Sequence, residues 1–180
     1  MSKQDVTLGS GDLYIKKFTG EIPADDVIEV EENKIGGISG GASVSYKPTL
    51  ETVADDKGFV WRVFIKDTEV IFKSGVLSWN LDVLNKLALA GEITTIENKK
   101  RRLVLGQRGA IDSHLIRFVH TKGDGSKFRV TIVGTCQNGF ELVFDAEKAT
   151  VIDAEFVAGS LDQNGTKLIL EEDIVEVGGR

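Results

Sequence analysis

The sequence predicts a mainly β protein, an antiparallel β-sandwich or barrel with one flanking α-helix at about residues 80–90. Apolar and polar side chains alternate with a period of two in several segments, which is typical of strands with one buried face. The dipeptides Asn138-Gly139 and Asn164-Gly165 favour hairpins, because a type I′ turn needs positive φ at both central positions. Repeated hairpins indicate antiparallel neighbours.

The composition is that of one ordinary globular domain. The 180 residues are 41% apolar and 28% charged, so we treat residues 1–180 as a single domain. The net charge of −6 disfavours a nucleic-acid-binding surface. Cys136 is the single cysteine, which excludes an internal disulfide and fits a reducing compartment. Residues 1–5 carry no secretory apolar region and no apolar run approaches ~18 residues, so we expect cytoplasmic assembly without a membrane partner.

Residues 20–41 differ from the rest of the chain and predict a long assembly loop. Residues 19–33 contain six acidic residues and no Lys or Arg, and a glycine-rich stretch follows. A stretch of about 20 residues without a core pattern is usually functional or disordered. We expect it to become ordered on contact with another subunit, and a phosphate-binding loop is disfavoured because the P-loop ending is missing. The candidate contact residues are Gly36, Gly37, Gly40, Gly41, Glu29, Glu31 and Glu32.

Strands are expected before and after this region in a regular succession. The turn Asp55-Asp56-Lys57-Gly58 would join a strand after Ser43 to a strand that starts at Phe59, and Gly123-Asp124-Gly125 would join residues 113–121 to 127–135. The expected inward-facing residues are Phe59, Trp61, Val63 and Ile65; Leu103 and Leu105; Phe128, Val130 and Ile132; Phe140, Leu142 and Phe144; Thr150, Ile152, Ala154 and Phe156; and Leu168 and Leu170.

The segment from Asn80 to Gly91 is the one with helical spacing. Asn80 can cap the first turn, and Leu81, Leu84 and Ala88 form an apolar stripe flanked by Leu87. Gly91 suits the position after the helix, so we expect about three turns packed on one face of a sheet.

A basic run at Lys99, Lys100, Arg101 and Arg102 stands out in this acidic chain. It could contact phosphate or an acidic partner, or it could be a solvated turn before the strand at Leu103. A third interpretation is that it docks on the acidic segment 21–32 of a neighbouring copy.

No group of residues in the sequence predicts catalysis, a metal site or a cofactor. His114 and His120 share one face of an expected strand about 20 Å apart, too far for one metal ion. Cys136 has no evident base beside it, so a buried bystander is the better interpretation. We therefore expect a protein that is not an enzyme.

Several patterns resemble those of the tail tube proteins (major tail proteins) of long-tailed bacteriophages, most like those with non-contractile tails. They are Leu8-Gly9-Ser10-Gly11-Asp12-Leu13-Tyr14-Ile15, Gly40-Gly41 before Ser43-Val44-Ser45-Tyr46, the turn Asp55-Asp56-Lys57-Gly58, and Val76-Leu77-Ser78-Trp79-Asn80 before the helix. The resemblance covers most of the chain and is best over residues 6–91.

The resemblance implies a structural virion protein, located in the tail and assembled in the host cytoplasm. It implies a β-sandwich flanked by a helix, hexameric rings of identical subunits stacked into a tube, and DNA that leaves the capsid through the lumen without specific binding. Other tail proteins, namely the tape measure, the terminator and the baseplate or tip, would be further partners. Segment 20–41 would bridge subunits, and residues 41–74 would contribute to the sheet that lines the tube.

Three other functions stay open at this point. The chain could be another phage ring protein, such as a tail terminator, connector or baseplate component. It could be a carbohydrate- or peptide-binding β-module, although the aromatic residues mostly alternate as if they were in a core. A small hydrolase is disfavoured because the histidines and the cysteine form no recognisable site.

Overall fold

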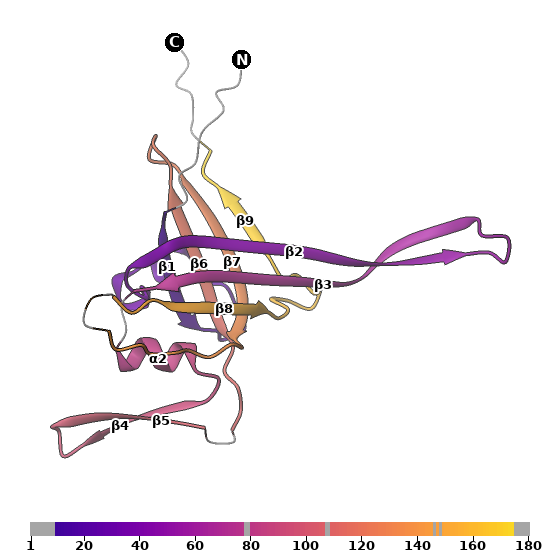
Figure 1. The fold of residues 1–180 in the computed structure, drawn as a ribbon. Coiled ribbons are helices and arrows are strands. Elements are labelled where there is room, and N and C mark those ends of the chain that lie inside the picture. The colour runs from indigo at the N-terminus through magenta and orange to yellow at the C-terminus, as the bar shows by residue number, and fades with distance from the viewer. Residues whose placement is uncertain (1–9, 78–79, 107–108, 146, 148, 175–180) are drawn as a thin grey trace, which may run out of the picture.

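The protein is mainly β, with antiparallel sheets and a long hairpin that projects from a two-layered sandwich (Figure 1). The computed structural model describes residues 10–77, 80–106, 109–145, 147 and 149–174. Its strands are β1 (Asp12–Lys17), β2 (Ile38–Ala54), β3 (Val60–Val76), β4 (Gly91–Ile96), β5 (Lys100–Leu105), β6 (His114–Thr121), β7 (Lys127–Cys136), β8 (Ile152–Ala158) and β9 (Ile169–Glu172). Its helical elements are α1 (Asp25–Ile28), the single 3₁₀ turn η1 (Glu31–Asn33) and α2 (Leu81–Leu87).

Strand β7 joins the two layers of the sandwich. Within the described residues, seven strands form one antiparallel sheet. Six of them follow the order β1-β6-β7-β8-β3-β2, and the seventh, β9, also pairs with β7. The first half of β7 pairs with β9 and its last residues pair with β8, while β6 runs along its other edge. Layer one is therefore β1, β6, β7 and β9, and layer two is β8, β3 and β2 (Figure 1).

The core between the layers is built from the alternation that the sequence predicts. Val130 and Ile132 of β7 and Ile152, Ala154 and Phe156 of β8 are buried, as expected. The ring of Phe72 packs against the rings of Phe118 and Phe156, with centroids 5.9 and 6.4 Å apart. Aromatic pairs at this separation stabilise a core beyond their buried area.

Helix α2 confirms the predicted helix, but it is shorter than expected. The Oδ1 atom of Asn80 accepts a hydrogen bond from the backbone N–H of Val83 at 3.0 Å, which confirms Asn80 as the N-cap. Leu84 and Leu87 are buried against the core, together with Val83. The helix ends at Leu87, and Gly91 begins strand β4 instead of following the helix directly.

Residues 20–41, predicted to be an assembly loop, contact the chain's own sandwich at two buried residues, and their role in assembly stays a prediction. Ile28 of α1 is fully buried against the outer face of layer one, where it meets Leu115, Val133 and Leu161. Ile35 is buried between the layers, and its N–H donates to the carbonyl oxygen of Leu13 in β1. Single apolar residues anchor this segment, so no periodic pattern marks them in the sequence.

Strands β4 and β5 form a separate hairpin beside α2. Glu97 and Asn98 have φ angles of 50° and 52°, so both adopt the left-handed conformation in the three-residue turn between the paired residues Ile96 and Lys100. The Lys99 N–H closes the turn on the Ile96 carbonyl oxygen at 3.0 Å. The sequence predicts only the second of these strands.

Two further expectations need correction. Residues 140–144 form no strand: Phe140 and Leu142 pack partly against the core, whereas Phe144 is 79% exposed. Leu170 in β9, expected to face inward, is 52% exposed.

Among the described residues, no helix combines the length and the apolar character needed to cross a membrane.

Candidate assembly interface

The most unusual feature of the molecule is the distal part of the β2–β3 hairpin, residues 47–69, which we call the arm. Both strands have 17 residues, about three times the usual strand length. Strand β8 pairs with β3 only from Ile71 to Val76, so in the arm each strand has the other as its one partner among the described strands. Figure 1 shows this two-stranded ribbon extending far beyond the sandwich.

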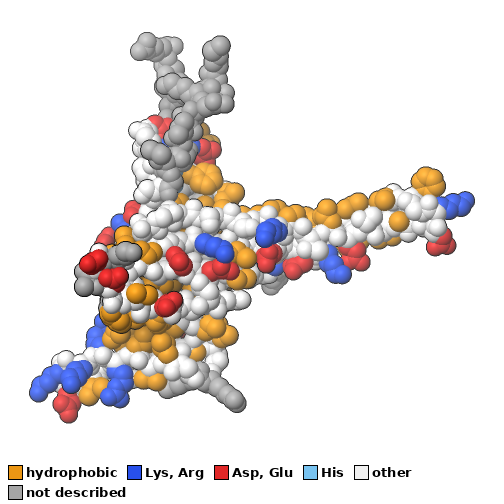
Figure 2. All heavy atoms as spheres, viewed as in Figure 1, with side chains coloured by type: hydrophobic (Ala, Val, Ile, Leu, Met, Phe, Trp, Pro, Cys, Tyr) orange, Lys and Arg blue, Asp and Glu red, His pale blue; other side chains and the backbone are white. Residues whose placement is uncertain are grey.

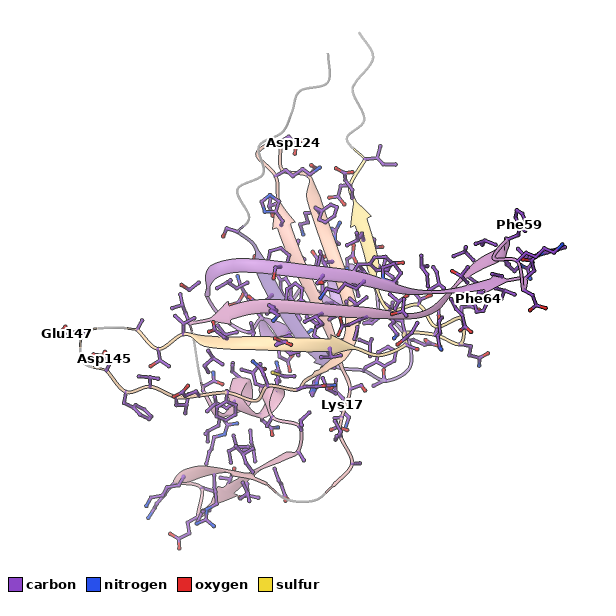
Figure 3. All side chains as sticks on the ribbon, turned by 45° about the vertical axis from the view of Figure 1, so that its right-hand side comes forward. Lys17, Phe59, Phe64, Asp124, Asp145 and Glu147 are labelled. Carbon is purple, nitrogen blue, oxygen red and sulfur yellow. The ribbon has the colours of Figure 1, made fainter. Side chains whose placement is uncertain are left out.

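The arm carries large apolar side chains that no other part of the described chain covers. Trp61 is 77% exposed and Phe59 is 69% exposed. Figure 3 shows Phe59 and Phe64 on the outer half of the arm, away from the sandwich. The other exposed apolar residues of the arm are Leu50, Val53, Val60, Val63 and Ile65. The prediction that Phe59, Trp61, Val63 and Ile65 face an inner core is therefore wrong for the single chain.

Apolar side chains lie on both faces of the arm. Residues directly opposite each other in an antiparallel pair share a face. Leu50 is opposite Ile65 and Thr52 is opposite Val63 on one face, whereas Phe64 is opposite Glu51 on the other. Figure 2 shows hydrophobic side chains along one side of the arm and at its end. Because both faces are apolar, the arm is suited to insertion between partners.

The tip of the arm is held by a built turn. The Oδ1 atom of Asp55 accepts hydrogen bonds from the N–H groups of Phe59 at 2.8 Å and Lys57 at 3.0 Å. These backbone donors, Phe59 first, hold the pKa of Asp55 below its usual value. Gly58 has a φ of +82°, a conformation that favours glycine. The tip is thus shaped before any partner is present, which confirms the predicted turn.

The start of the β2–β3 hairpin, before the arm, contains the four glycines that we predict as contact residues. Gly40 and Gly41 have φ angles of +77° and +78° and form a bulge in β2 between Ser39 and Ala42. Gly37 accepts the Leu77 N–H through its carbonyl oxygen at 2.9 Å, and Gly36 has a φ of +103°. These residues bend the chain where the hairpin starts. Their role in contacts between subunits stays a prediction.

Glu29 is not a free contact residue, which corrects its place in the predicted loop. Its side chain is 7% exposed and accepts hydrogen bonds from Arg129 Nε and Lys127 Nζ, both at 2.6 Å. Burial raises the pKa of Glu29, but the hydrogen bonds and the positive charges of Lys127 and Arg129 together lower it by more, so the pKa is below its usual value. Glu31 and Glu32 are exposed, as a contact role requires.

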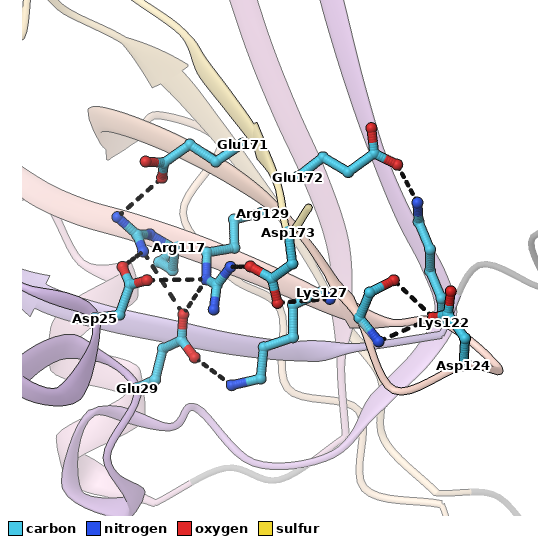
Figure 4. Close-up of polar contacts among 11 residues, drawn as sticks. Asp25, Glu29, Arg117, Lys122, Asp124, Lys127, Arg129, Glu171, Glu172 and Asp173 are labelled. Atoms are coloured by element: carbon cyan, nitrogen blue, oxygen red, sulfur yellow. Dashed lines mark hydrogen bonds and ion pairs between the residues drawn. The ribbon is translucent and has the colours of Figure 1, made fainter. Parts of the chain in front are cut away.

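Glu29 belongs to an ionic network on the outer face of layer one (Figure 4). Arg117, whose side chain is 3% exposed, pairs with Asp25 of α1. Its Nη1 atom also lies 3.6 Å from Glu29 Oε1, and its Nη2 atom lies 3.6 Å from Glu171 Oε2. Arg129 also pairs with Asp173, just after β9. The network fastens α1 and the end of β9 to strands β6 and β7, so its function is structural.

The basic run lies at the free end of the β4–β5 hairpin. Arg101 forms a two-pronged ion pair with Asp82 of α2, at 2.5 and 2.9 Å. Lys99, Lys100 and Arg102 are exposed. Arg101 thus has an ion-pair partner in its own chain, which distinguishes it from the other three residues.

The residues considered for catalysis or metal binding do not converge. His120 is buried, with Nδ1 2.5 Å from the carbonyl oxygen of Ser10, and His114 lies at the other end of β6, where burial lowers its pKa. Burial raises the pKa of the Cys136 thiol, which lies 3.2 Å from Asn138 Oδ1. Within the described ranges, no three His, Cys, Asp or Glu side chains are placed to hold a metal ion.

Sequence reasoning missed the arm as a site because it assigned the arm's apolar residues to the core. Two signals could have identified it. Alternation continues on both sides of the turn at Asp55 for longer than a usual strand, and apolar residues occur on both faces of the second strand.

Comparison with known proteins identifies no family for this chain. No family model matches it, and no curated protein sequence matches it.

Proposed function

We propose that this chain is a tail tube protein of a long-tailed bacteriophage. Copies would form hexameric rings that stack into the tube through which DNA leaves the capsid. The observation that supports this proposal best is the arm, which is long, apolar on both faces and uncovered in the single chain. The resemblance of residues 6–91 to tail tube proteins supplies the identity of the assembly.

The energetics of the arm favour burial between copies. Fully burying one large apolar side chain stabilises by about 1.5–3 kcal/mol, and the arm exposes several of them. An isolated two-stranded ribbon is marginally stable in water. Packing against neighbouring copies would both order the ribbon and remove its apolar surface from water.

The open edge of β2 supports self-assembly in a second way. β2 is the last strand in its sheet, so one row of its backbone N–H and C=O groups has no strand partner among the described residues. Such edges pair readily with other chains. A ring that continues the pairing from copy to copy would satisfy these groups.

An arm that docks on a different surface of the next copy makes a heterologous contact. Contacts of that type generate rings or open filaments, and a tube of stacked rings combines both. The net charge of −6 also suits a conduit for DNA, because a chain with a net negative charge does not retain phosphates by charge.

Negative-stain electron microscopy of the purified protein over a range of concentrations tests the proposal. Long hollow tubes of constant width are the expected result. Isolated rings that never stack would instead indicate a tail terminator, a connector or a baseplate component. A species that stays monomeric at every concentration, also with the other tail proteins present, would refute self-assembly.

A further inference from the structure

The β4–β5 hairpin presents its basic residues in two directions. Directly opposed residues share a face, so Thr95 and Arg101 lie on the same face as Ile93 and Leu103. This face is turned to α2, because Arg101 reaches Asp82 and Leu103 packs against the core. Neighbouring strand residues point to opposite faces, so Lys100 and Arg102 point away from α2.

Three cations therefore project from the molecule at one place. Lys99 is the last residue of the turn, and Lys100 and Arg102 lie on the outer face beside it. All three are exposed, and none forms an ion pair with an acidic residue in the described part of the chain. Figure 2 shows the Lys and Arg side chains gathered at the free end of this hairpin. The Arg101–Asp82 pair holds the hairpin against α2 and so fixes their direction.

The acidic segment is divided in the same way. Asp25 and Glu29 turn inward to Arg117 and Arg129. Asp26, Glu31 and Glu32 are exposed, and in the described ranges they have no ion pair within the chain. The amide of buried Asn33 donates to the carbonyl oxygens of Val27 and Ile28, both at 3.1 Å, which fixes the turn that carries Glu31 and Glu32.

We propose that the outward cations of the β4–β5 hairpin, Lys99, Lys100 and Arg102, bind the outward acids Glu31 and Glu32 of a second copy of this chain. The proposal rests on the proposed self-assembly and adds a second contact to that of the arm. Both surfaces are fixed in advance by contacts within their own chain, and their charges are complementary. In an assembly of chains with a net charge of −6, this contact would offset the repulsion between copies.

The two surfaces differ, so the contact is heterologous and leaves a bound pair of copies with one free surface of each sign. A contact of this kind can be repeated indefinitely from copy to copy. It would also make assembly dependent on ionic strength, because exposed charges are screened by salt.

Charge reversal tests the proposal in the full chain. Three variants are compared with the wild type by sedimentation velocity at low and high salt: Lys100→Glu with Arg102→Glu, Glu31→Lys with Glu32→Lys, and all four changes together. We expect each double reversal to raise the protein concentration needed for assembly about tenfold or more at low salt. The fourfold variant should recover most of the loss, because the attraction is restored with opposite signs.

Lys17→Ser is the matched control, because Lys17 is an exposed cation outside both surfaces and is paired with Asp112 in its own chain. It should leave the assembly concentration within about twofold of the wild type. Circular dichroism checks that every variant is folded. Assembly of the double reversals at the wild-type concentration, or a fourfold variant as defective as either double one, would overturn the contact while leaving self-assembly intact.

A DNA fragment in the same experiment distinguishes the other source of negative charge. Retention of DNA by the wild type that Lys100→Glu with Arg102→Glu abolishes, with unchanged assembly, would show that phosphate is the partner and would overturn the proposal. A wild-type chain that never assembles would instead refute the proposed function itself.

Discussion

Glu29 shows how one buried carboxylate can organise a whole segment. It lies between Arg129 and Lys127, and its short ion pairs hold α1 against layer one. Taking charges out of water is costly, and close opposite charges offset that cost. The network therefore stabilises the fold most when each of its buried charges has an opposite charge beside it.

We expect Glu29→Ala to lower the free energy of unfolding by about 3 kcal/mol, because it leaves Arg129 and Lys127 without their closest shared partner. Urea denaturation of both proteins, under conditions where they are monomeric, measures the difference. Glu31→Ala is the matched control from the same segment, and its effect should stay within about 0.5 kcal/mol, since Glu31 is exposed. Equal losses in the two variants would contradict the structural role of Glu29.

The lowered pKa of Glu29 predicts a dependence of stability on pH. The folded pKa is below the ordinary value of 4.5, so the carboxylate's contribution is complete above that value and is lost as the pH falls through the folded pKa. The wild type and Glu29→Gln should therefore differ most in free energy of unfolding at neutral pH. The difference should shrink as the pH falls below 4.5 and through the lower pKa of the folded state. A difference that is constant with pH would show that the carboxylate charge is not what Glu29 contributes.

At the scale of elements, the arm is the part of the fold with the least support from its own chain. Lys167 Nζ contacts Asp67 Oδ1 at 3.0 Å and the Thr68 carbonyl oxygen at 2.6 Å, so the base is anchored. Beyond that point the two strands stabilise only each other among the described strands. The arm should accordingly be the most readily opened β element until a partner covers it.

Amide hydrogen exchange followed by mass spectrometry checks this expectation. In the monomer, residues 50–65 should exchange much faster than Ile71–Val76 at the other end of the hairpin, which pairs with β8. Assembly should slow exchange in the arm and leave the core strands unchanged. Equal protection of arm and core in the monomer would show that the ribbon needs no partner.

The sequence correctly predicts the strands whose apolar face packs into the core of this chain. For β8, the residues that share a face are also those that are buried, whereas both faces of β7 are buried. For Phe59 to Ile65, the alternation predicts the strand correctly but not what covers it, because periodicity contains no information on packing partners. Strand β4 is rich in threonine and has few apolar residues, and the anchors Ile28 and Ile35 are single residues, so neither produces a pattern.

In the candidate site too, the sequence predicts the features that depend on neighbouring residues and misses those that depend on distant ones. The turn at Asp55 and the N-cap at Asn80 depend on local chemistry, and both are confirmed. The inward direction of Glu29 and Arg101 depends on Arg129 and Asp82, which are distant in sequence. Such tertiary pairs divide the acidic and basic runs into structural and exposed residues, and a charge count does not reveal that division.

At the scale of the whole molecule, the sandwich packs around its own core, whereas no other described strand pairs with the arm or with the outer edge of β2. A soluble monomer rarely exposes a large continuous apolar surface without an interaction to cover it. The central claim is therefore that apolar side chains at the end of the arm are buried between copies of this chain.

Sedimentation velocity of Phe59→Ser with Trp61→Ser beside the wild type tests that claim most directly. Ile111→Ser serves as the control, because Ile111 is also an exposed apolar residue, 56% exposed, but it lies outside the arm. We predict that the arm variant stays monomeric, with its thermal unfolding unchanged, at concentrations where the wild type and the control assemble. Assembly of the arm variant at the wild-type concentration would contradict the account.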